Sequence, residues 1–427
     1  MDAEAFEPGV EFARRMDRED PLAGFRERFH IPQTDDGGDE IYLCGHSLGL
    51  QPKIAADYVA AELDAWRRRG VKGHFEGDHP WLPYHEFVAE PMAEMVGGEP
   101  GEVVAMNSLT TNLHLMMVSF YRPGRACHKI LMEAHAFPSD RFAVESQIRH
   151  HGFDPADSLV LLSPRPGEEL IRPEDVEKII ETEGNAIALI LLPGVQYYTG
   201  QVFPMEEITR QGHAKGCKVG FDLAHAAGNI PLHLHRWNVD FAVWCTYKYM
   251  NSGPGSVGGC FVHARHGGDA GLDRFGGWWG HDKATRFEMA PRYKPIAGAE
   301  GWQLSNPPIL ALAAVRASLE VFRDAGYMAP LRRKSLLLTG YLEWLLAKEL
   351  GGRMAMITPG EPDERGAQLS LKVAGGRELF AQLEAACVTV DWREPDVIRV
   401  APTPLYNSFE DCYRFVEILG GLVRDRL

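Results

Sequence analysis

The chain of 427 residues is long enough for about two domains with sizeable cores, and its composition, 45% hydrophobic and 24% charged, is ordinary for a globular protein. Its net charge of −15 argues against nucleic acid or an anionic membrane surface as a partner. Seven scattered cysteines form no C-x-x-C pair, which is typical of reduced thiols rather than a disulfide framework.

The N-terminal segment, residues 1–40, is predicted to be an arm or loop because it is rich in charge and contains an Asp-Asp-Gly-Gly run at 35–38. Its first seven residues are acidic and lack the apolar region of a secretory signal. No run in the chain approaches the ~18 apolar residues that a membrane span requires. We therefore expect a cytoplasmic protein with no membrane partner.

Short apolar strands alternate with amphipathic helices in the middle of the chain. Strands are predicted at 129–132, 186–192, 218–221, 241–244 and 259–262, and helices at 173–180 and 205–215. The first of these helices opens on Pro173, and Gly216 ends the second. This alternation predicts an α/β fold with a mostly parallel central sheet and flanking helices.

The C-terminal part of the chain changes character. Two long helices are predicted at 308–325 and 329–349, followed by strands at 368–373 and 397–400 and helices at 377–386 and 408–423. We predict three parts: an arm, 1–44, that contributes to the small domain; a large cofactor-binding domain, 45–325; and a small α+β domain, 326–427.

The chemistry centres on Asp222 and Lys248, which each follow a predicted strand. Ligands of such sheets bind beyond the carboxyl ends of the strands, where both side chains are expected. Burial lowers the pKa of a lysine and makes it a candidate Schiff-base former. Pyridoxal phosphate needs such a lysine, together with a carboxylate that keeps its ring nitrogen protonated. The alternatives are a surface lysine and an aspartate that only caps a turn.

The phosphate of such a cofactor requires converging backbone N–H groups. Residues 108–112, Ser-Leu-Thr-Thr-Asn, precede an apolar run and are typical of a helix N-terminus, which binds phosphate through free N–H groups and its dipole. A plain Ser/Thr cap is the alternative. Phe137 could stack on a flat ring, and Asp140 could be a cofactor ligand or only an N-cap.

Two further motifs carry no functional prediction. Residues 253–258 fit G-x-G-x-x-G, but they lead into a strand rather than a helix, so a dinucleotide site is not expected. His233 and His235 suggest a metal, but with no carboxylate or cysteine set beside them in the sequence we interpret them as loop or surface histidines. No metal site is predicted.

Several segments in order resemble the kynureninase family, pyridoxal-phosphate hydrolases of the aspartate-aminotransferase-like fold (fold type I). The resemblance runs from about Ile41 to Phe415. It is carried by the segments 45–52 (GHSLGLQP), 136–140 (AFPSD), 221–226 (FDLAHA), 247–249 (YKY), 305–308 (SNPP) and 399–402 (RVAP).

The resemblance implies a role for each matching residue. Lys248 would bind the cofactor covalently and move the α-proton of the substrate, and Tyr247 would protonate Cβ. The cofactor shell would contain Leu109, Thr110, Phe137, Pro138, Ser139, Asp140, Asp222, His225, Tyr247, Lys248, Trp278 and Asn306. The substrate pocket would contain Arg399 as the clamp of the α-carboxylate, with His281, His74, Ser47 and Asn306.

The implied reaction is the hydrolytic Cβ–Cγ cleavage of L-kynurenine or 3-hydroxy-L-kynurenine to anthranilate or 3-hydroxyanthranilate plus L-alanine, in tryptophan catabolism and NAD biosynthesis. Trp278 and Asn306 match positions that reach the site from the neighbouring subunit, which implies a homodimer. His74 and Asn306 match the pairing of members that favour the 3-hydroxylated substrate, although His74 could instead only support its loop.

Two departures from the family pattern stand out: His46 replaces a usual asparagine, and Pro193 stands where a small hydroxyl residue is common near the phosphate. Two alternative functions stay open. A cysteine desulfurase-like lyase shares the fold, but such enzymes typically carry His before the lysine and a mobile cysteine, whereas Tyr247 precedes Lys248 and Cys387 has a core-like context. A non-catalytic regulatory relative is the other.

Overall fold

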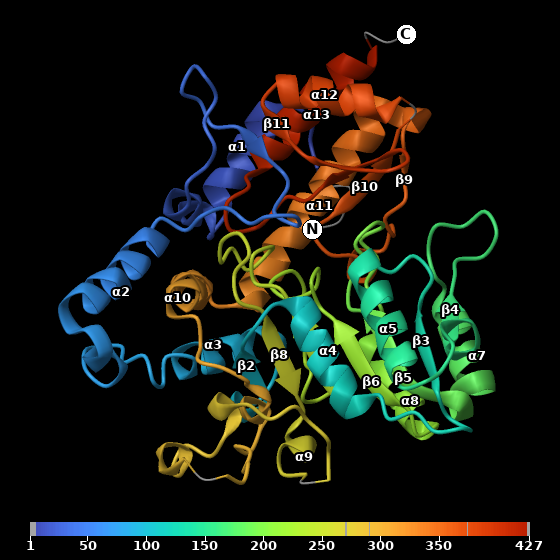
Figure 1. Cartoon of the computed structure of the whole chain (residues 1–427). Coiled ribbons are helices and arrows are strands. Elements are labelled where there is room, and N and C mark those ends of the chain that lie inside the picture. Colours follow the sequence, from blue (N-terminus) through green and yellow to red (C-terminus); the bar gives the residue numbers. More distant parts are fainter. Residues whose placement is uncertain (1–5, 270, 290, 374, 425–427) are drawn as a thin grey trace.

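The computed structural model describes residues 6–269, 271–289, 291–373 and 375–424. A seven-stranded sheet in the order β2-β8-β7-β6-β5-β3-β4 forms its centre (Figure 1). The strands are β2 (Val103–Ala105), β3 (Lys129–Glu133), β4 (Leu159–Leu162), β5 (Ile187–Pro193), β6 (Lys218–Asp222), β7 (Phe241–Trp244) and β8 (Gly259–Val262). The neighbours from β4 to β7 pair in parallel, and β8 is antiparallel to both of its neighbours. The predicted mostly parallel sheet is confirmed.

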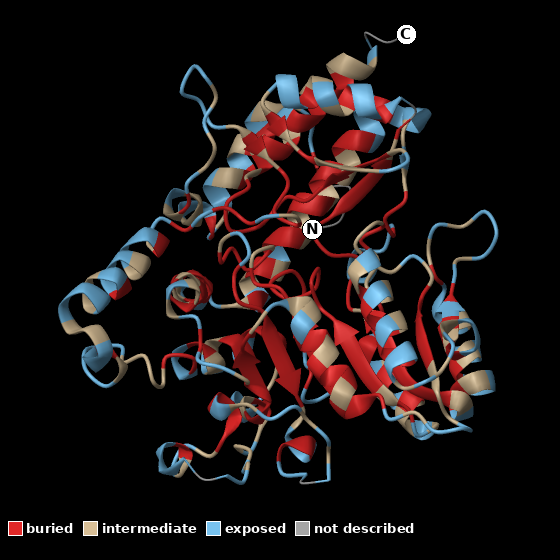
Figure 2. Cartoon of the chain, viewed as in Figure 1, coloured by how far each residue is buried: buried red, intermediate tan, exposed pale blue. Residues whose placement is uncertain are grey.

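Helices cover both faces of this sheet, so inner strands such as β5 and β7 are buried on both sides (Figure 2). Along β5, Leu189 and Leu191 pack toward α4 (Leu109–Phe120) and α5 (Pro138–His150). Ile190 and Leu192 point to the opposite face, because successive side chains of a strand alternate. That face is covered by α3 (Glu86–Val96), α7 (Pro173–Glu183), α8 (Met205–Ala214) and α10 (Ile309–Asp324).

Three further helices lie outside these layers. α2 (Ala55–Arg69) packs on α10 and leads into a 3-10 helix, Gly70–His74, at the edge of the molecule (Figure 1). α6 (Pro155–Ser158) and α9 (Ala264–Gly267) are single turns before β4 and after β8.

A second hydrophobic core lies in the C-terminal part of the chain. Its antiparallel sheet has the order β12-β13-β10-β9, formed by Asp391–Arg393, Val397–Val400, Leu369–Lys372 and Ala355–Met356. Its helices are α11 (Met328–Leu350), α12 (Gly376–Ala385) and α13 (Phe409–Arg424). The predicted α+β character of this part is confirmed.

The N-terminal segment is more ordered than the sequence suggested. It contains α1 (Val10–Glu19) and a 3-10 helix, Ala23–Arg28, so the interpretation of residues 1–40 as a loop is wrong for these stretches. α1 buries Phe12, Ala13 and Met16 in the second core, and its other positions are mostly charged, which hid this short apolar stripe.

The predicted arm, residues 1–44, also adds a strand to this part of the molecule. β1 (Ile41–Tyr42) pairs in parallel with β11 (Val388–Thr389). The division at 44 and 325 stays a prediction, and residues 1–5, 374 and 425–427 of its outer parts lie outside the described residues.

The predicted elements agree with the structure to within a few residues. The strands 241–244, 259–262 and 397–400 coincide with β7, β8 and β13, and the G-x-G-x-x-G stretch leads into β8 as expected. Within the described part of the chain, no helix combines the length and apolar character needed to cross a bilayer.

Candidate active site

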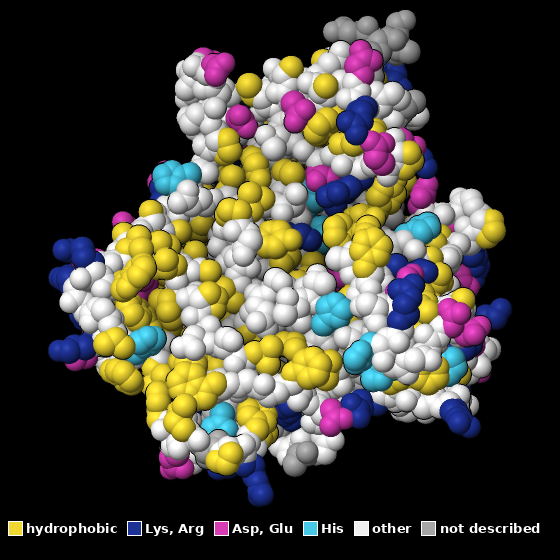
Figure 3. All heavy atoms as spheres, in the orientation of Figure 1, with side chains coloured by type: hydrophobic (Ala, Val, Ile, Leu, Met, Phe, Trp, Pro, Cys, Tyr) yellow, Lys and Arg dark blue, Asp and Glu magenta, His cyan; other side chains and the backbone are white. Residues whose placement is uncertain are grey.

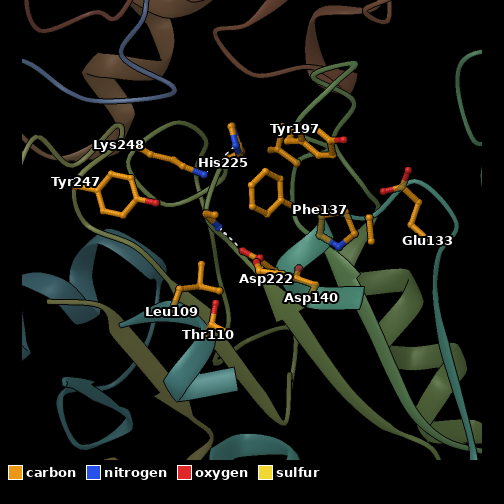
Figure 4. A pocket seen from close by; sticks show the side chains of 15 residues that line it. Leu109, Thr110, Glu133, Phe137, Asp140, Tyr197, Asp222, His225, Tyr247 and Lys248 are labelled. Carbon is orange, nitrogen blue, oxygen red and sulfur yellow. Dashed lines mark hydrogen bonds between the residues drawn. The ribbon is translucent and has the colours of Figure 1, made fainter. Parts of the chain in front are cut away.

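A pocket opens at the carboxyl edge of the central sheet (Figure 4). Of the predicted site residues, Leu109, Thr110, Phe137, Ser139, Asp140, Asp222, His225, Tyr247 and Lys248 line it. The remaining lining residues are Glu133, Ala136, Pro193, Val195, Tyr197 and Ala224.

The topology explains why residues distant in sequence meet here. Parallel strands end at one edge of a sheet, where their following loops converge. Glu133, Pro193 and Asp222 are the last residues of β3, β5 and β6, and Lys248 follows β7 by one turn. The residues at the end of each of these strands therefore line the same pocket.

Lys248 reaches into this pocket beside His225. The Nζ of Lys248 lies 3.0 Å from the Nε2 of His225. Burial, and then the positive charge of Lys248, hold the pKa of His225 well below its usual range. A neutral imidazole can accept a hydrogen bond from the lysine, so His225 orients the amine without adding charge.

Asp222 is buried at the base of the pocket and accepts a hydrogen bond from the backbone N–H of Ala224 at 2.7 Å. Asp140 lies beside it (Figure 4). Burial and then the charge of Asp222 raise the pKa of Asp140 well above that of an ordinary aspartate. Burial and the neighbouring carboxyl group therefore disfavour a second negative charge on Asp140. Asp140 is no N-cap, because Phe137 occupies that position of α5 and Asp140 lies inside the helix.

The opposite end of the pocket offers donors for an anion. Ser108 is the N-cap of α4, so the first N–H groups of that helix, including those of Leu109 and Thr110, have no partner within the helix. A Cβ on Gly258 would lie 2.9 Å from the carbonyl of Trp244 and 3.2 Å from the N of Leu109. Only glycine lets this loop approach the helix N-terminus so closely.

These groups fit pyridoxal phosphate by their chemistry. Lys248 supplies the amine, and Asp222 supplies a buried negative charge for a protonated ring nitrogen. Phe137 supplies an aromatic face, and its ring packs edge-on against Tyr197 with centroids 5.3 Å apart. The N-terminus of α4, with the hydroxyl of Thr110, suits the phosphate.

Arg399 does not line this pocket, but it touches the pocket wall from the second core. It is 1% exposed, and its Nη1 donates to the carbonyl of Tyr197 at 2.6 Å. Asp391 accepts from its Nε at 2.9 Å. Burial lowers the pKa of Arg399, although the charge of Asp391 opposes this.

Pro138 and Ser47 are placed next to the pocket rather than in its lining. Pro138 is the first residue of α5, between two lining residues. Ser47 belongs to a turn whose Gly49 donates its backbone N–H to the carbonyl of Tyr247 at 2.8 Å.

Four other predicted residues also do not line the pocket of their own chain. Trp278 and His281 line a separate surface hollow, where the Nε2 of His281 lies 3.1 Å from the hydroxyl of Thr285. Asn306 is exposed before α10. His74 ends the 3-10 helix after α2, with its ring edge-on to Trp81 at 5.3 Å.

The two departures from the family pattern occupy different surroundings. Pro193 lines the pocket, where its ring can supply no hydroxyl. His46 is fully buried, and neither ring nitrogen has a hydrogen-bond partner among the described residues. Burial, and then the charge of Arg399, hold the pKa of His46 well below its usual range.

The structure adds residues that the sequence did not reveal. Glu133 extends the predicted strand 129–132 by one position, so a longer strand would have placed it at the same edge. Tyr197 follows β5 in a turn with no local signal. The interpretation of His235 as a loop histidine with no carboxylate partner is wrong, because folding brings Glu102 to 2.9 Å from its Nδ1.

The Glu102 carboxylate also accepts hydrogen bonds from the backbone N–H groups of Glu99 and Ala264. Because these hydrogen bonds hold the carboxylate of Glu102 next to residue 264, the side chains of His235 and His263 lie close to it. Folding brings the three side chains together from distant parts of the sequence, which no local spacing indicates.

The fold and the pocket define a pyridoxal-phosphate-dependent enzyme of fold type I. The structure is similar to the apo cysteine desulfurase of Thermococcus onnurineus NA1, with a TM-score of 0.74 and 17% identity over 90% of this chain and 95% of that one. It is equally similar to a C-DES mutant with glycine covalently linked to its PLP cofactor, at 16% identity over 89% and 96% of the two chains. At these identities the likeness concerns the fold.

The sequence comparisons give the family. The chain is 59% identical over 418 residues to the kynureninase of Koribacter versatilis, covering 98% of each chain. It is 56% identical over 421 residues to that of Myxococcus xanthus, covering 98% of this chain and 99% of the relative. Residues 331–419 match the family model described as the kynureninase C-terminal domain. The chain belongs to the kynureninase family, and the predicted resemblance is confirmed.

The desulfurase alternative loses support at the level of individual residues. Cys387 is half-buried rather than core, and its carbonyl accepts a hydrogen bond from Ile41 beside β11. It does not line the pocket of Lys248. Cys245 is buried three residues before the lysine, and burial raises the pKa of its thiol.

Proposed function

We propose that this protein hydrolyses the Cβ–Cγ bond of L-kynurenine and 3-hydroxy-L-kynurenine in the pocket of Lys248, releasing an aromatic acid and L-alanine. Membership of the kynureninase family supports the reaction. The observation that carries the assignment of the site is the grouping of Lys248, His225, Asp222 and Phe137 around one pocket.

The bound cofactor would supply an electron sink that stabilises carbanions next to the amino group of the substrate. Asp222 would pair with the protonated ring nitrogen, and the raised pKa of Asp140 beside it favours the neutral form of that neighbour. Phe137 would cover one face of the ring. The N-terminus of α4 would hold the phosphate, with Thr110 and Ser139 as hydroxyl donors.

Lys248 and Tyr247 would move the protons. Lys248 would hold the cofactor covalently, and its amine would move the proton of Cα. Tyr247 would donate a proton at Cβ after the bond is cleaved. Burial raises the pKa of Tyr247 well above its usual range, which keeps its hydroxyl protonated and able to donate. The Nζ of Lys248 lies 6.0 Å from the centre of the Tyr247 ring, so both groups serve one reacting centre.

Arg399 would bind the α-carboxylate of the substrate. Its planar guanidinium suits a carboxylate, and burial at the pocket wall strengthens that attraction. Its position in β13 means that substrate binding would bridge the central sheet and the second core.

We further propose that the protein is a homodimer whose subunits complete each other's sites. Trp278 and Asn306 do not line the pocket of their own chain, although they match family positions of the active site. Hydrophobic side chains gather over α2 and the segments beside it (Figure 3). Exposed large hydrophobic residues occur on α2 and just after it, at Leu63, Trp66, Val71 and Phe75, and in the segment 275–289, at Phe275, Trp278, Phe287 and Met289. A patch of this kind on a globular chain indicates an interface.

For the substrate ring we propose a preference for the 3-hydroxylated form. An imidazole and an amide, from His74 and Asn306, can both hydrogen-bond a ring hydroxyl. A site that pairs such groups with a hydroxyl discriminates against the analogue that lacks it.

Turnover assays with L-kynurenine, 3-hydroxy-L-kynurenine and L-cysteine test the proposal. We expect alanine and the matching aromatic acid from the first two substrates, with the larger kcat/KM for the hydroxylated one. Release of sulfide from cysteine, with no cleavage of either kynurenine, would contradict it.

A further inference from the structure

The turn formed by residues 196–199 lies between the pocket and the second core. Side chains from the second core donate hydrogen bonds to its carbonyls. Arg399 and Gln368 bind the carbonyl of Tyr197 at 2.6 and 3.0 Å. Ser370 binds that of Tyr198 at 2.5 Å, and Thr358 binds that of Thr199 at 2.6 Å. This turn is therefore the contact surface for Arg399 and for the sheet β12-β13-β10-β9 that carries it.

The side chain of Gln196 holds the turn in shape from inside. Its Oε1 accepts hydrogen bonds from the backbone N–H groups of Tyr198 at 2.5 Å and Thr199 at 2.8 Å. Gln196 is 4% exposed, so these bonds are shielded from water. With the amide oxygen committed to the turn, the amide nitrogen must find an acceptor elsewhere.

Glu133 is that acceptor. The Nε2 of Gln196 donates to the two carboxylate oxygens of Glu133 at 3.1 and 3.4 Å, and lies 3.4 Å from the carbonyl of His135. Glu133 is 3% exposed. Burial raises the pKa of Glu133 to about 7, and the hydrogen bond from Gln196 opposes that rise. A buried carboxylate is costly unless it is hydrogen-bonded, so the hydrogen bond from Gln196 stabilises the ionised form of Glu133.

We propose that Glu133, acting through Gln196, is a positioning residue for Arg399: the pair fixes the turn whose carbonyls set the guanidinium at the pocket wall. The proposal rests on the proposed function, since it takes Arg399 as the clamp of the substrate carboxylate. Glu133 acts on substrate binding through this chain of contacts.

The same turn also reaches the cofactor side of the pocket. The ring of Tyr197 packs edge-on against Phe137, while the carbonyl of Tyr197 holds Arg399. A shift of the turn therefore displaces the clamp relative to the aromatic wall. Because Arg399 binds the carboxylate in both ground and transition states, its displacement raises KM and largely spares kcat.

Exchanging the two side chains tests this directly. Gln196→Glu keeps an acceptor for the turn but removes the donor, and it sets two carboxylates side by side. Glu133→Gln combined with Gln196→Glu restores one donor and one acceptor in the reverse order. Glu169→Gln is the matched control, because Glu169 binds Lys372 across the same two regions at the surface, away from the turn.

We expect Gln196→Glu to raise KM for 3-hydroxy-L-kynurenine by about tenfold with kcat within about threefold, and the double variant to recover KM within about threefold. Glu169→Gln should leave both unchanged. Hydrogen exchange of residues 197–199, measured without substrate, should be faster in Gln196→Glu and return toward the parent rate in the double variant.

Unchanged KM and exchange in a folded Gln196→Glu protein, or no recovery in the double variant, would overturn the proposal. So would a Glu133→Gln variant that loses kcat with KM unaltered, because it would give the carboxylate a direct chemical role. If Gln196→Glu does not fold, Glu133→Leu must show the same KM and exchange changes. A parent protein inactive on both kynurenines would defeat the proposed function, and exchange at the turn would still decide whether Glu133 anchors it.

Discussion

Two buried aspartates at opposite edges of the central sheet have opposite roles. Asp222 ends β6 at the carboxyl edge, and Asp240 immediately precedes β7 at the amino edge. Asp240 is 1% exposed and is surrounded by donors from its own chain. These are His213 Nε2 at 2.8 Å, His266 Nε2 at 2.7 Å, Arg265 Nη2 at 2.7 Å and the backbone N–H of Val219 at 2.8 Å, with Lys218 Nζ at 3.6 Å.

The electrostatics of the two aspartates differ accordingly. Burial alone would raise the pKa of Asp240, but the hydrogen bonds from His213 and His266 and the nearby cations outweigh it and hold that pKa far below its usual range. Asp222 instead faces a second carboxyl group, and it raises the pKa of Asp140. Asp240 is neutralised by cations of its own chain, so its role is structural. Asp222 lies beside another acid instead, so it is available to a cationic ligand.

The largest effect is expected from removal of the Lys248 amine, which lies in the same pocket as Asp222. Lys248→Ala should lower kcat/KM by at least about 10³-fold, because among the described residues that line the pocket no second lysine could bind the cofactor covalently and move the α-proton. Borohydride reduction of the parent protein, followed by peptide mapping, should place the pyridoxyl label on Lys248. A label on a different lysine would end this assignment.

Asp222→Ala should lower activity, in line with the functional role that the comparison gives Asp222. Without a partner for the ring nitrogen the electron sink weakens, and we expect kcat to fall by about 10³-fold, well beyond any loss of cofactor affinity. Its free energy of unfolding should change by less than about 1 kcal/mol, since the variant loses the hydrogen bond from Ala224 but no longer buries a carboxylate beside Asp140. Near-normal turnover would contradict the assigned role.

Asp240→Asn should instead lower stability, in line with the structural role of Asp240. Removal of one buried charge leaves its cationic partners uncompensated, so the free energy of unfolding should fall by about 3 kcal/mol with kcat/KM retained. Because the folded pKa is depressed, the stabilisation is present above about pH 4 and is lost as the pH falls toward the folded value. Urea unfolding between pH 3 and 7 should show this dependence in the parent and a weaker one in the variant. Loss of activity without loss of stability would reverse the comparison.

Mixing two inactive variants tests whether the site that contains Asp222 is built from residues of both subunits. A Lys248→Ala chain and a Trp278→Ala chain, combined in equal amounts, should regain about a quarter of the parent activity. Half of the dimers are then mixed, and each mixed dimer has one intact site. If exchange of subunits is demonstrated and no activity returns, Trp278 serves its own chain.

The smallest expected effect concerns the substrate ring. His74→Trp with Asn306→Thr should narrow the difference in kcat/KM between 3-hydroxykynurenine and kynurenine, with the cofactor spectrum unchanged. The two substrates should be compared in parent and variant under identical conditions. An equal preference in the parent would remove this prediction and leave the assignment of the reaction intact.

The sequence by itself determined the layered fold, the edge of the sheet that binds ligands, and most residues of the pocket. Strand and helix periodicity are local, and the order of parallel strands places Asp222, Lys248 and Phe137 at one edge without further information. The amphipathic pattern also predicted most helices within a few residues.

Only the tertiary structure decided which polar groups are partnered. The apolar stripe of α1, the cations around Asp240, and the path from Glu133 through Gln196 to Arg399 all join residues far apart in the chain. Such contacts depend on strand register and on how the two cores meet, and no spacing along the sequence encodes either. The same residue type therefore became a structural anchor at 240 and a ligand-facing charge at 222, because burial and neighbouring charge, rather than identity, decide what a carboxylate does.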